Sequence, residues 1–479
     1  MSATRLIARD ELRLMVRNRV AVIAFTLLVL LTLVAVLSSW AHQRGNAELR
    51  ARHQHAAEHA FDAQPDRHPH RVVHYGHFIF RPLGPLAAFD PGVDAFTGSS
   101  MFLEGHRQNT TNFGDVRQSS LLVRFGQLTP AFVLQAVAPL LLIFLGYGAL
   151  ARETERGTMR LLMLQGASRG QVVRGKLRAL GTVALLAGLP AMIGFVAIAD
   201  QPGALALPIA TIAIGYAAYL ALWVVLILLV SASVRGSRDA LLALVAMWAV
   251  AVVLLPRVAP DLASAAVPLQ NRLQTDVAIA RDLRRMGDSH NPDDPHFAAF
   301  KQSVLKRYGV MRVEDLPVNY KGLLALEGER LTSELFERYA GKSYAAQNRQ
   351  NALVMGVSVL SPAIALRSLS MVAAGTDFAG HRRFLEQAEA YRYALVQRLN
   401  RMQAEAVSYS DDTATDTDAD RRKRVAADNW EQMPDFTYRA PSGAALATGA
   451  LPGLAIVLGW LAVAGVLLVR ASRRLGESR

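Results

Sequence analysis

The segments AFVLQAVAPLLLIFLGYGALA (residues 131–151) and ALGTVALLAGLPAMIGFVAIA (residues 179–199) enclose the basic loop RETERGTMRLLMLQGASRGQVVRGKLR (residues 152–178). Each apolar segment is 21 residues long and contains no charged residue. A hydrocarbon core of about 30 Å needs about 20 apolar residues in a helix, so both segments are predicted to cross a membrane. Two spans joined by a short basic loop indicate a polytopic membrane protein.

Four further segments have similar length and composition, namely residues 20–40, 209–231, 240–258 and 446–469. The apolar run of the third is shorter, and it continues through Pro256, which predicts a bend or an end at that point. We therefore expect an all-α polytopic membrane protein with six transmembrane helices and mostly helical extracytoplasmic domains.

Composition supports this class. Of the 479 residues, 52% are hydrophobic and 19% are charged, whereas soluble domains carry about 25% charged residues. An ordinary soluble enzyme is therefore excluded. The chain has no cysteine, which excludes disulfides, thiol chemistry, cysteine-ligated zinc and iron–sulfur clusters.

The net charge of +13 is best explained as a topology signal. Six spans place both termini on one side of the membrane, together with two loops. These four segments, residues 1–19, 152–178, 232–239 and 470–479, contain 18 Lys and Arg against 6 Asp and Glu. The positive-inside rule places this side in the cytoplasm. Nucleic acid is not an expected partner, because no aromatic-interleaved basic stripe or nucleic-acid motif is present.

Two long segments are expected outside. Residues 41–130 form a first, His-rich extracytoplasmic domain, in which short strands at residues 72–74 or 78–80 are predicted. Residues 259–445 form a second, helical domain, in which the acidic and then basic tract 408–424 is predicted to be a flexible linker.

Residues 353–373 are apolar enough to resemble a seventh span. Ser361-Pro362 and Arg367 interrupt the segment, and a seventh span would move the basic C-terminal tail outside. We interpret it as an interfacial or re-entrant helix.

Residues 1–19 are predicted to form an amphipathic helix on the inner leaflet of the membrane. One i, i+4 row consists of Arg5, Arg9, Arg13 and Arg17, and the side chains turned away from it are Ala8, Leu12, Met15 and Val16. A solvated basic tail is the alternative.

The loop 152–178 contains the densest motif of the chain. Glu153 and Glu155 precede Gly157-Thr158, and the apolar run from Met159 to Leu164 follows. Thr158 is suited to cap a helix. The pattern predicts a short helix across the membrane face that offers apolar side chains to a partner. The candidate coupling residues are Glu153, Glu155, Gly157, Thr158, Arg160, Leu161 and Leu164. A simple basic connecting loop is the alternative.

The segment ETERGTMRLLMLQGASRGQVVRGK resembles the signature of type-2 ABC exporter permeases: an acidic residue, Gly-Thr-Leu, a Leu pair, a Ser/Arg turn and Gly-Lys. Met159 stands where that family usually has Leu. The segments HYGHFIFRPLGPLAAFDPGVDAFTG and FGQLTPAFVLQAVAPLLLIFLGYGALARE resemble the branch with large extracytoplasmic domains between the first two spans and before the last.

This resemblance implies that residues 5–19 and 153–165 meet separate ABC ATPase subunits. It also implies a second permease copy or a related permease as a dimer partner, the lipid bilayer of a bacterial inner (plasma) membrane, and a periplasmic partner. This chain itself is expected to bind no cofactor, because ATP and Mg²⁺ belong to the ATPase subunit.

Nine of the twelve histidines lie between residues 42 and 106. Imidazoles are common ligands of zinc and copper, so His74, His77 and His106 are candidate metal ligands. Solvated loop histidines are the competing explanation.

Almost no ionisable residue lies within a span, which disfavours ion-coupled transport. The chain has no Walker A motif, since the required first glycine before Gly341-Lys342-Ser343 is Phe336. We therefore expect no enzyme activity and an ATP-driven permease subunit of an ABC transporter, coupled through residues 153–165. The alternative is a mechanotransmission subunit that moves its outer domains and no substrate. A membrane-anchored metallohydrolase is disfavoured, because no carboxylate is spaced as a general base beside the histidines.

Overall fold

The computed structural model describes residues 2–111, 128–198, 202–287, 291 and 294–475. Among these residues, six helical stretches are long and apolar enough to cross a membrane, which confirms the predicted fold class. They are Arg19–Asp62, Pro130–Glu155, Arg169–Val196, Leu205–Ser233, Ser237–Ala266 and Gly443–Ser472.

Four of these spans are built on single helices, α2 (Arg19–Asp62), α10 (Arg169–Ile198), α11 (Pro202–Ser233) and α22 (Gly443–Ser472). The other two spans each combine several helical segments. The second consists of α6 (Pro130–Phe132), η3 (Val133–Val137), α7 (Ala138–Gly146) and α8 (Ala151–Glu155). The fifth consists of α12 (Ser237–Trp248), η4 (Ala249–Leu254) and α13 (Leu255–Ala266).

The two composite spans are divided into segments for the same reason. Each contains a π-helical turn, η3 or η4, directly before a segment whose second residue is a proline, Pro139 or Pro256. A proline cannot donate to the carbonyl four residues earlier and its ring crowds that carbonyl, and a wider turn relieves the clash. The released carbonyl of Gln135 accepts a hydrogen bond from the Tyr219 hydroxyl at 2.9 Å. Side chains of neighbouring helices thus satisfy backbone groups that lipid cannot.

The helix α11 is the centre of the membrane part. Its apolar stretch is 72% buried, against 6% for the fifth span. It packs against α7, α10 and α22, and Tyr216, Tyr219 and Trp223 are buried on it. The fifth span therefore lies at the periphery of the bundle, with most of its apolar surface exposed.

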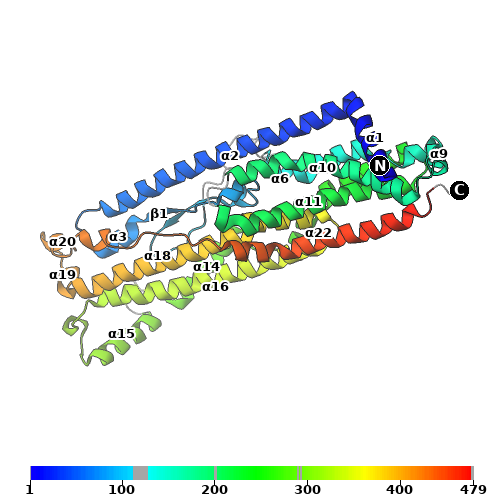
Figure 1. Ribbon diagram of the computed structural model, residues 1–479. Helices are drawn as coiled ribbons and strands as arrows, with labels where there is room; N and C mark the ends of the chain where they lie inside the picture. Colours follow the sequence, from blue (N-terminus) through cyan, green and yellow to red (C-terminus); the bar gives the residue numbers. More distant parts are fainter. Residues whose placement is uncertain (1, 112–127, 199–201, 288–290, 292–293, 476–479) are drawn as a thin grey trace.

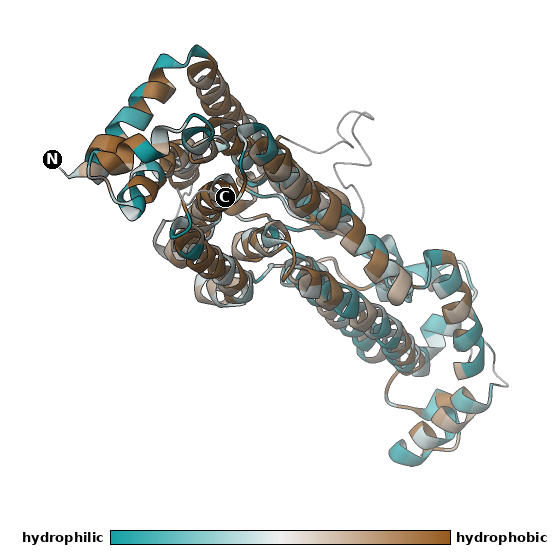
Figure 2. Cartoon of the chain, turned by 90° about the vertical axis from the view of Figure 1, so that its right-hand side faces the viewer, coloured by the Kyte–Doolittle hydropathy of each residue, from teal (hydrophilic) through white to brown (hydrophobic). Residues whose placement is uncertain are grey.

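The two ends of the molecule differ in character. α1 (Ala3–Arg17), α9 (Thr158–Leu164) and the end of α22 lie together at one end of the elongated bundle, here called the terminal end (Figure 1). The opposite end, here called the distal region, comprises residues 41–111 and 267–440 apart from residues 362–374, which pack in the bundle. Figure 2 shows mostly hydrophobic ribbons in the bundle and hydrophilic ribbons in the distal region.

The distal region contains many short elements and three longer helices, α14 (Arg272–Met286), α16 (Tyr320–Val357) and α18 (Phe378–Ala406). Two antiparallel strands pair His77 with Leu103 and Phe80 with Ser100. The short elements are α3 (Pro69–Tyr75), β1 (His77–Phe80), η1 (Pro85–Ala88), α4 (Asp94–Thr97), β2 (Ser100–Leu103), α15 (Pro295–Tyr308), η5 (Val313–Asp315), α19 (Tyr409–Thr413), α20 (Ala419–Arg422) and α21 (Asp428–Glu431).

The apolar segment 353–373 is not one continuous helix. α16 ends at Val357, and α17 (Pro362–Ala374) begins after a turn that is capped by the Ser361 side chain. α17 packs against α11 and α22. A Cβ on Gly453 of α22 would lie 2.6 Å from the Ala365 carbonyl oxygen, so only glycine permits this approach. α17 is thus mostly buried within the bundle, whereas Leu353, Val359 and Leu360 before it are exposed.

The strand expected at residues 78–80 is present within β1 (His77–Phe80). Two other local expectations are wrong. Residues 72–74 belong to the helix α3 and not to a strand, because Pro69 at its first turn favours a helix. The tract 408–424 is not a free linker. Asp412 within it is buried and accepts hydrogen bonds from Asn319 at 2.8 Å and Gln403 at 2.9 Å. These contacts bind the tract to α16 and α18.

Candidate functional site

The short helix α9 lies at the terminal end, between two glycines with left-handed backbone conformations. Gly157 has φ 73° and Gly166 has φ 86°, values that side chains with a Cβ disfavour. The Thr158 hydroxyl donates to the Glu153 carbonyl at 3.2 Å and to the Glu153 carboxylate. The predicted glycine-bounded helix is therefore present, with Thr158 fixing its first turn.

The side chains of α9 divide into an anchor and an exposed face. Met159 is 1% exposed and belongs to the apolar core of the bundle. Leu161 is 56% exposed and Leu164 is 83% exposed, and Arg160 is also exposed. Two leucines on one short helix are thus offered to the outside of this chain.

A buried ion-pair cluster connects α8, the helix directly before α9, with two other helices. The Lys176 ammonium on α10 lies 2.6 Å from Glu11 Oε2 on α1 and 2.9 Å from Glu153 Oε1 on α8. The Lys176 side chain is only 5% exposed. A buried charge is tolerated because it is paired, so the cluster fixes α1, α8 and α10 relative to one another.

Gly175, the residue before Lys176 in the Gly-Lys motif, lies where α1 crosses α10. A Cβ at this position would lie 2.6 Å from Ile7 Cγ2 and 3.2 Å from the Thr4 carbonyl oxygen on α1. Glycine therefore allows α1 to cross α10 closely, and Lys176 then reaches Glu11.

The helix α1 uses one face for this contact and leaves its arginines outside. Thr4 is buried and Glu11 is half-buried, whereas Arg5, Arg9, Arg13 and Arg17 are all exposed. Val16, expected on the apolar face, is 72% exposed. α1 ends at Asn18, whose side chain accepts a hydrogen bond from Val20 N at 3.1 Å and caps α2.

The remaining candidate, Glu155, contacts the start of α12. Its Oε2 accepts a hydrogen bond from the backbone nitrogen of Ser237 at 3.1 Å, at the start of α12. Nearby, the Ser231 hydroxyl accepts from the backbone nitrogens of Leu150 and Ala151. The residues before α9 are thus attached to α11 and α12 as well.

Sequence reasoning missed Glu11, Ser231 and the role of Lys176. A lone lysine at the start of an apolar helix is a signal that an acidic partner exists. The partner cannot be named from sequence, because Glu11 lies 165 residues away.

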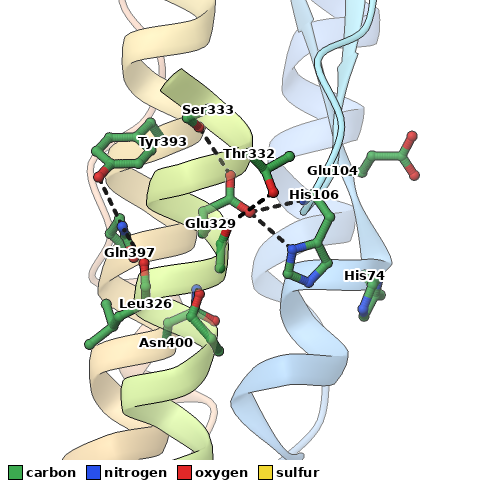
Figure 3. Close-up of polar contacts among 12 residues, drawn as sticks. His74, Glu104, His106, Leu326, Glu329, Thr332, Ser333, Tyr393, Gln397 and Asn400 are labelled. Atoms are coloured by element: carbon green, nitrogen blue, oxygen red, sulfur yellow. Dashed lines mark hydrogen bonds and ion pairs between the residues drawn. The ribbon is translucent and has the colours of Figure 1, made fainter. Parts of the chain in front are cut away.

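A second polar cluster lies in the distal region. His70, His74 and His106 place ligand-type nitrogens within 4.8 Å of one another. Burial, with the neighbouring His74 and His106, lowers the pKa of His70 to about 4, so this ring is neutral at pH 7. His106 Nδ1 lies 3.2 Å from Glu329 Oε2, and Figure 3 shows His106 facing Glu329 with His74 beside it.

Of the expected metal ligands, the structure brings His74 and His106 together, but with His70 in place of His77. Gly76, with φ 78°, ends α3 before His77. His77 begins β1, and its ring packs 5.1 Å from the Phe61 ring, between ring centroids. Burial lowers the pKa of His77 to about 4. Its i, i+3 spacing from His74 is therefore not a helical spacing.

Comparison with known families divides the chain into two overlapping parts. Residues 5–279 match the family described as "ABC-2 family transporter protein". Residues 272–439 match a family described as "Domain of unknown function (DUF3526)". No curated protein matches the chain. The first match covers more than half of the chain and includes α1, α9, α10 and the His cluster. The chain therefore belongs to the ABC-2 transporter family and is a membrane permease subunit that associates with an ABC ATPase subunit.

Proposed function

We propose that this permease is an exporter subunit and that its ATPase partner binds the terminal end on a surface formed by α1 and the exposed face of α9. One observation carries the proposal: Leu161 and Leu164 are exposed on a helix that Met159 anchors in the apolar core of the bundle. Burial of one leucine side chain contributes about 1.5–3 kcal/mol. Two leucines therefore provide a substantial apolar contact for a partner.

The same helix is attached well enough to transmit movement. Thr158 at its start is hydrogen-bonded to Glu153 of α8. Glu153 joins α8 to α1 and α10 through Lys176, and Glu155 joins α8 to α12. A displacement of α9 by the ATPase would therefore move three helices of the permease together. A simple connecting loop would need none of these contacts.

The orientation follows from charge. The segments 1–19, 152–178, 232–239 and 470–479 carry 18 Lys and Arg against 6 Asp and Glu in the sequence, and basic short loops favour the cytoplasm. We place both chain termini and α9 in the cytoplasm of a bacterial cell and the distal region in the periplasm. The direction of transport, export, rests on the resemblance of residues 153–176 to type-2 exporter permeases.

A second copy or a related permease completes the translocation pathway in this proposal. The fifth span supports it, because only 6% of its apolar stretch is buried within this chain. ATP and Mg²⁺ are then bound by the ATPase subunit, and the permease supplies the path and the moving helices.

The variant Leu161→Asp tests the docking surface. A charge in an apolar contact is expected to abolish co-purification of the ATPase and the permease-dependent stimulation of ATP hydrolysis. Arg160→Ala, on the same helix, should weaken the binding free energy between permease and ATPase by less than about 1 kcal/mol, since exposed charge pairs are weak. Leu273→Asp, at a leucine 72% exposed in the distal region, controls for the substitution itself. Normal assembly and stimulation with Leu161→Asp would refute the docking surface.

Mechanotransmission remains a second candidate because of one feature, the length of α2. This helix has 44 residues, about twice the number needed to cross the membrane. Its outer part contacts β1, where Gln54 Oε1 accepts from Phe80 N at 2.8 Å. Movement of the membrane part would thus reach the distal region directly.

The variant Ala56→Pro distinguishes the two functions, because proline breaks a helix interior at about 3 kcal/mol. Ala56 is exposed on the outer part of α2. An exporter should still move substrate across vesicle membranes, whereas a mechanotransmitter should lose function in cells and keep stimulated ATP hydrolysis.

A further inference from the structure

Three histidines from two elements meet in the distal region. His70 and His74 lie one turn apart on α3, and His106 follows β2. The ring centroids of His70 and His74 are 4.6 Å apart. The centroid of the His106 ring lies 5.7 Å from that of His70 and 5.4 Å from that of His74. A cluster of three imidazoles is far more specific than two histidines on one helix face.

The distance between the first two rings suits a shared metal ion. His70 Nε2 and His74 Nε2 are 3.1 Å apart. Two nitrogens bound at about 2.0–2.1 Å to a tetrahedral Zn²⁺ ion lie about 3.3–3.4 Å from each other. The side chains therefore need only a small adjustment to bind one ion.

The third histidine is held by a buried carboxylate. Glu329 Oε2 accepts a hydrogen bond from the His106 backbone nitrogen at 3.0 Å and a second one from the His106 ring nitrogen Nδ1 at 3.2 Å. This bond places the proton on Nδ1 and leaves Nε2 as the ligand atom, as in carboxylate–histidine–zinc arrangements. Figure 3 shows the two contacts.

The backbone at His106 supports the same conclusion. Its φ is +60°, a left-handed conformation that costs energy for a residue with a Cβ. Two hydrogen bonds to one carboxylate hold the residue in this state. Glu329 is itself fixed, because Arg392 Nη1 lies 2.6 Å from its Oε1.

We propose that His70, His74 and His106 bind one divalent transition metal ion of the zinc class. Imidazole nitrogens suit Zn²⁺, Cu²⁺ and Ni²⁺ and not Mg²⁺ or Ca²⁺, which require oxygen ligands. Three imidazoles supply three of the four positions that Zn²⁺ prefers. The His106 side chain is 36% exposed, so solvent gives the ion access. This proposal does not depend on the proposed transport function.

The ion would be bound by the first long segment alone, and Glu329 would connect the site to the second. His70 and His74 belong to the segment between the first two spans, and Glu329, which orients His106, belongs to α16 before the last span. An isolated segment 41–130 would lack Glu329, so the whole chain is needed for the test.

The experiment uses the full-length protein in detergent, purified with a tag that contains no histidine and dialysed against Zn²⁺ at several free concentrations. Bound zinc is measured by mass spectrometry. His106→Asn is the main variant, because asparagine tolerates a positive φ but lacks the imidazole. We expect this variant to bind zinc at least about tenfold more weakly than wild type. At free zinc concentrations near the wild-type Kd, it should therefore lack the one equivalent of zinc per chain that wild type binds.

The double variant His55→Ala, His59→Ala is the matched control. These two histidines are also i, i+4 on a helix, α2, and both are exposed; their removal should leave the high-affinity equivalent unchanged. Equal zinc binding by wild type and His106→Asn would overturn the proposal, as would loss of the equivalent in the control.

Cobalt(II) gives a second readout that does not depend on stoichiometry. Its visible absorption distinguishes tetrahedral nitrogen ligation from the octahedral aquo ion. Wild type and the His55/His59 control should develop the tetrahedral spectrum, and His106→Asn should not. An octahedral spectrum in all three proteins would refute the site even if zinc binds.

Discussion

Lys176 at the terminal end and Arg392 in the distal region are both buried cations between two carboxylates. Lys176 lies between Glu11 and Glu153, whose side chains are 13% and 23% exposed. Arg392 lies between Glu329 and Glu389, whose side chains are 0% and 6% exposed. The two clusters therefore have the same arrangement of charges, but the carboxylates around Arg392 are more deeply buried than those around Lys176.

The cations differ in the number of bonds that they form. Lys176 forms its two charged contacts and no further one among the described residues. Arg392 contacts both Glu389 oxygens, at 2.9 and 2.7 Å, and also Glu329, the Ser333 hydroxyl and the Glu104 carbonyl. A guanidinium is a planar fork with five donors, whereas an ammonium is a compact charge on a flexible stem.

This difference suggests different mechanical roles. The Arg392 cluster fixes α16 against α18 and, through Glu329, positions His106. The Lys176 cluster joins three helices through a side chain that can follow a movement. We interpret the first as part of a rigid frame and the second as a joint, and the predictions below test that comparison.

The largest effect is expected from Arg392→Met. It leaves two buried carboxylates without their cation, which should lower the free energy of unfolding by about 3–5 kcal/mol. Thermal and denaturant unfolding in detergent measure this. Arg398→Met, at an exposed position on the same helix, should have little effect, and equal destabilisation by both variants would contradict a rigid frame.

Lys176→Met should destabilise less, by about 2 kcal/mol, because its partners are partly exposed and can take up water. Its effect on function should be larger than its effect on stability. We expect ATPase stimulation by the permease to be lost while the protein still folds, and Arg174→Met, exposed on α10, to retain stimulation. A variant that folds and couples normally would show that the cluster is not a joint.

Gly157→Ala tests the entry to α9. No atom lies within 4 Å of a Cβ built there, so only the positive φ opposes it, at about 1 kcal/mol. Gly341→Ala has equal space but lies inside α16, where alanine should stabilise by about 0.5–1 kcal/mol. The expected result is opposite signs in unfolding experiments, and two stabilising substitutions would show that α9 does not need the left-handed turn.

The smallest effect is expected at a third cation of the same kind, Arg422, which lies between Asp411 and Asp416 but is 41% exposed. Hydrogen bonds from Arg422 lower the pKa of Asp416 from 3.8 to about 2. A lowered acid pKa stabilises the fold above about pH 4, and this contribution is lost as the pH falls towards 2.

Asp416→Asn should therefore reduce stability slightly at pH 5 and not at pH 2, and salt should weaken the difference. The free energies of unfolding of wild type and Asp416→Asn, measured at pH 5 and at pH 2, give this difference. A loss as large as that of Arg392→Met would show that burial does not set the strength of these clusters.

The sequence alone determined the six helices long enough to cross a membrane, the interruption of residues 353–373 at Ser361-Pro362, and the short helix between Gly157 and Gly166. Each of these depends on local quantities: the free energy of moving about 20 consecutive side chains into hydrocarbon, and the backbone preferences of proline and glycine. Neighbours in the chain are sufficient to evaluate them. The segment 408–424 shows the limit of such reasoning, because its polar composition indicated a free linker while Asp412 is buried.

Only the tertiary structure decided which side chains meet. His106 contacts Glu329 across 223 residues and Lys176 contacts Glu11 across 165 residues. The choice of His70 over His77 as the third histidine depends on the positive φ of Gly76, because α3 ends at Tyr75, two residues before His77. Composition and periodicity report the environment that a segment requires, whereas pairing depends on how the helices pack, and packing is a property of the whole chain.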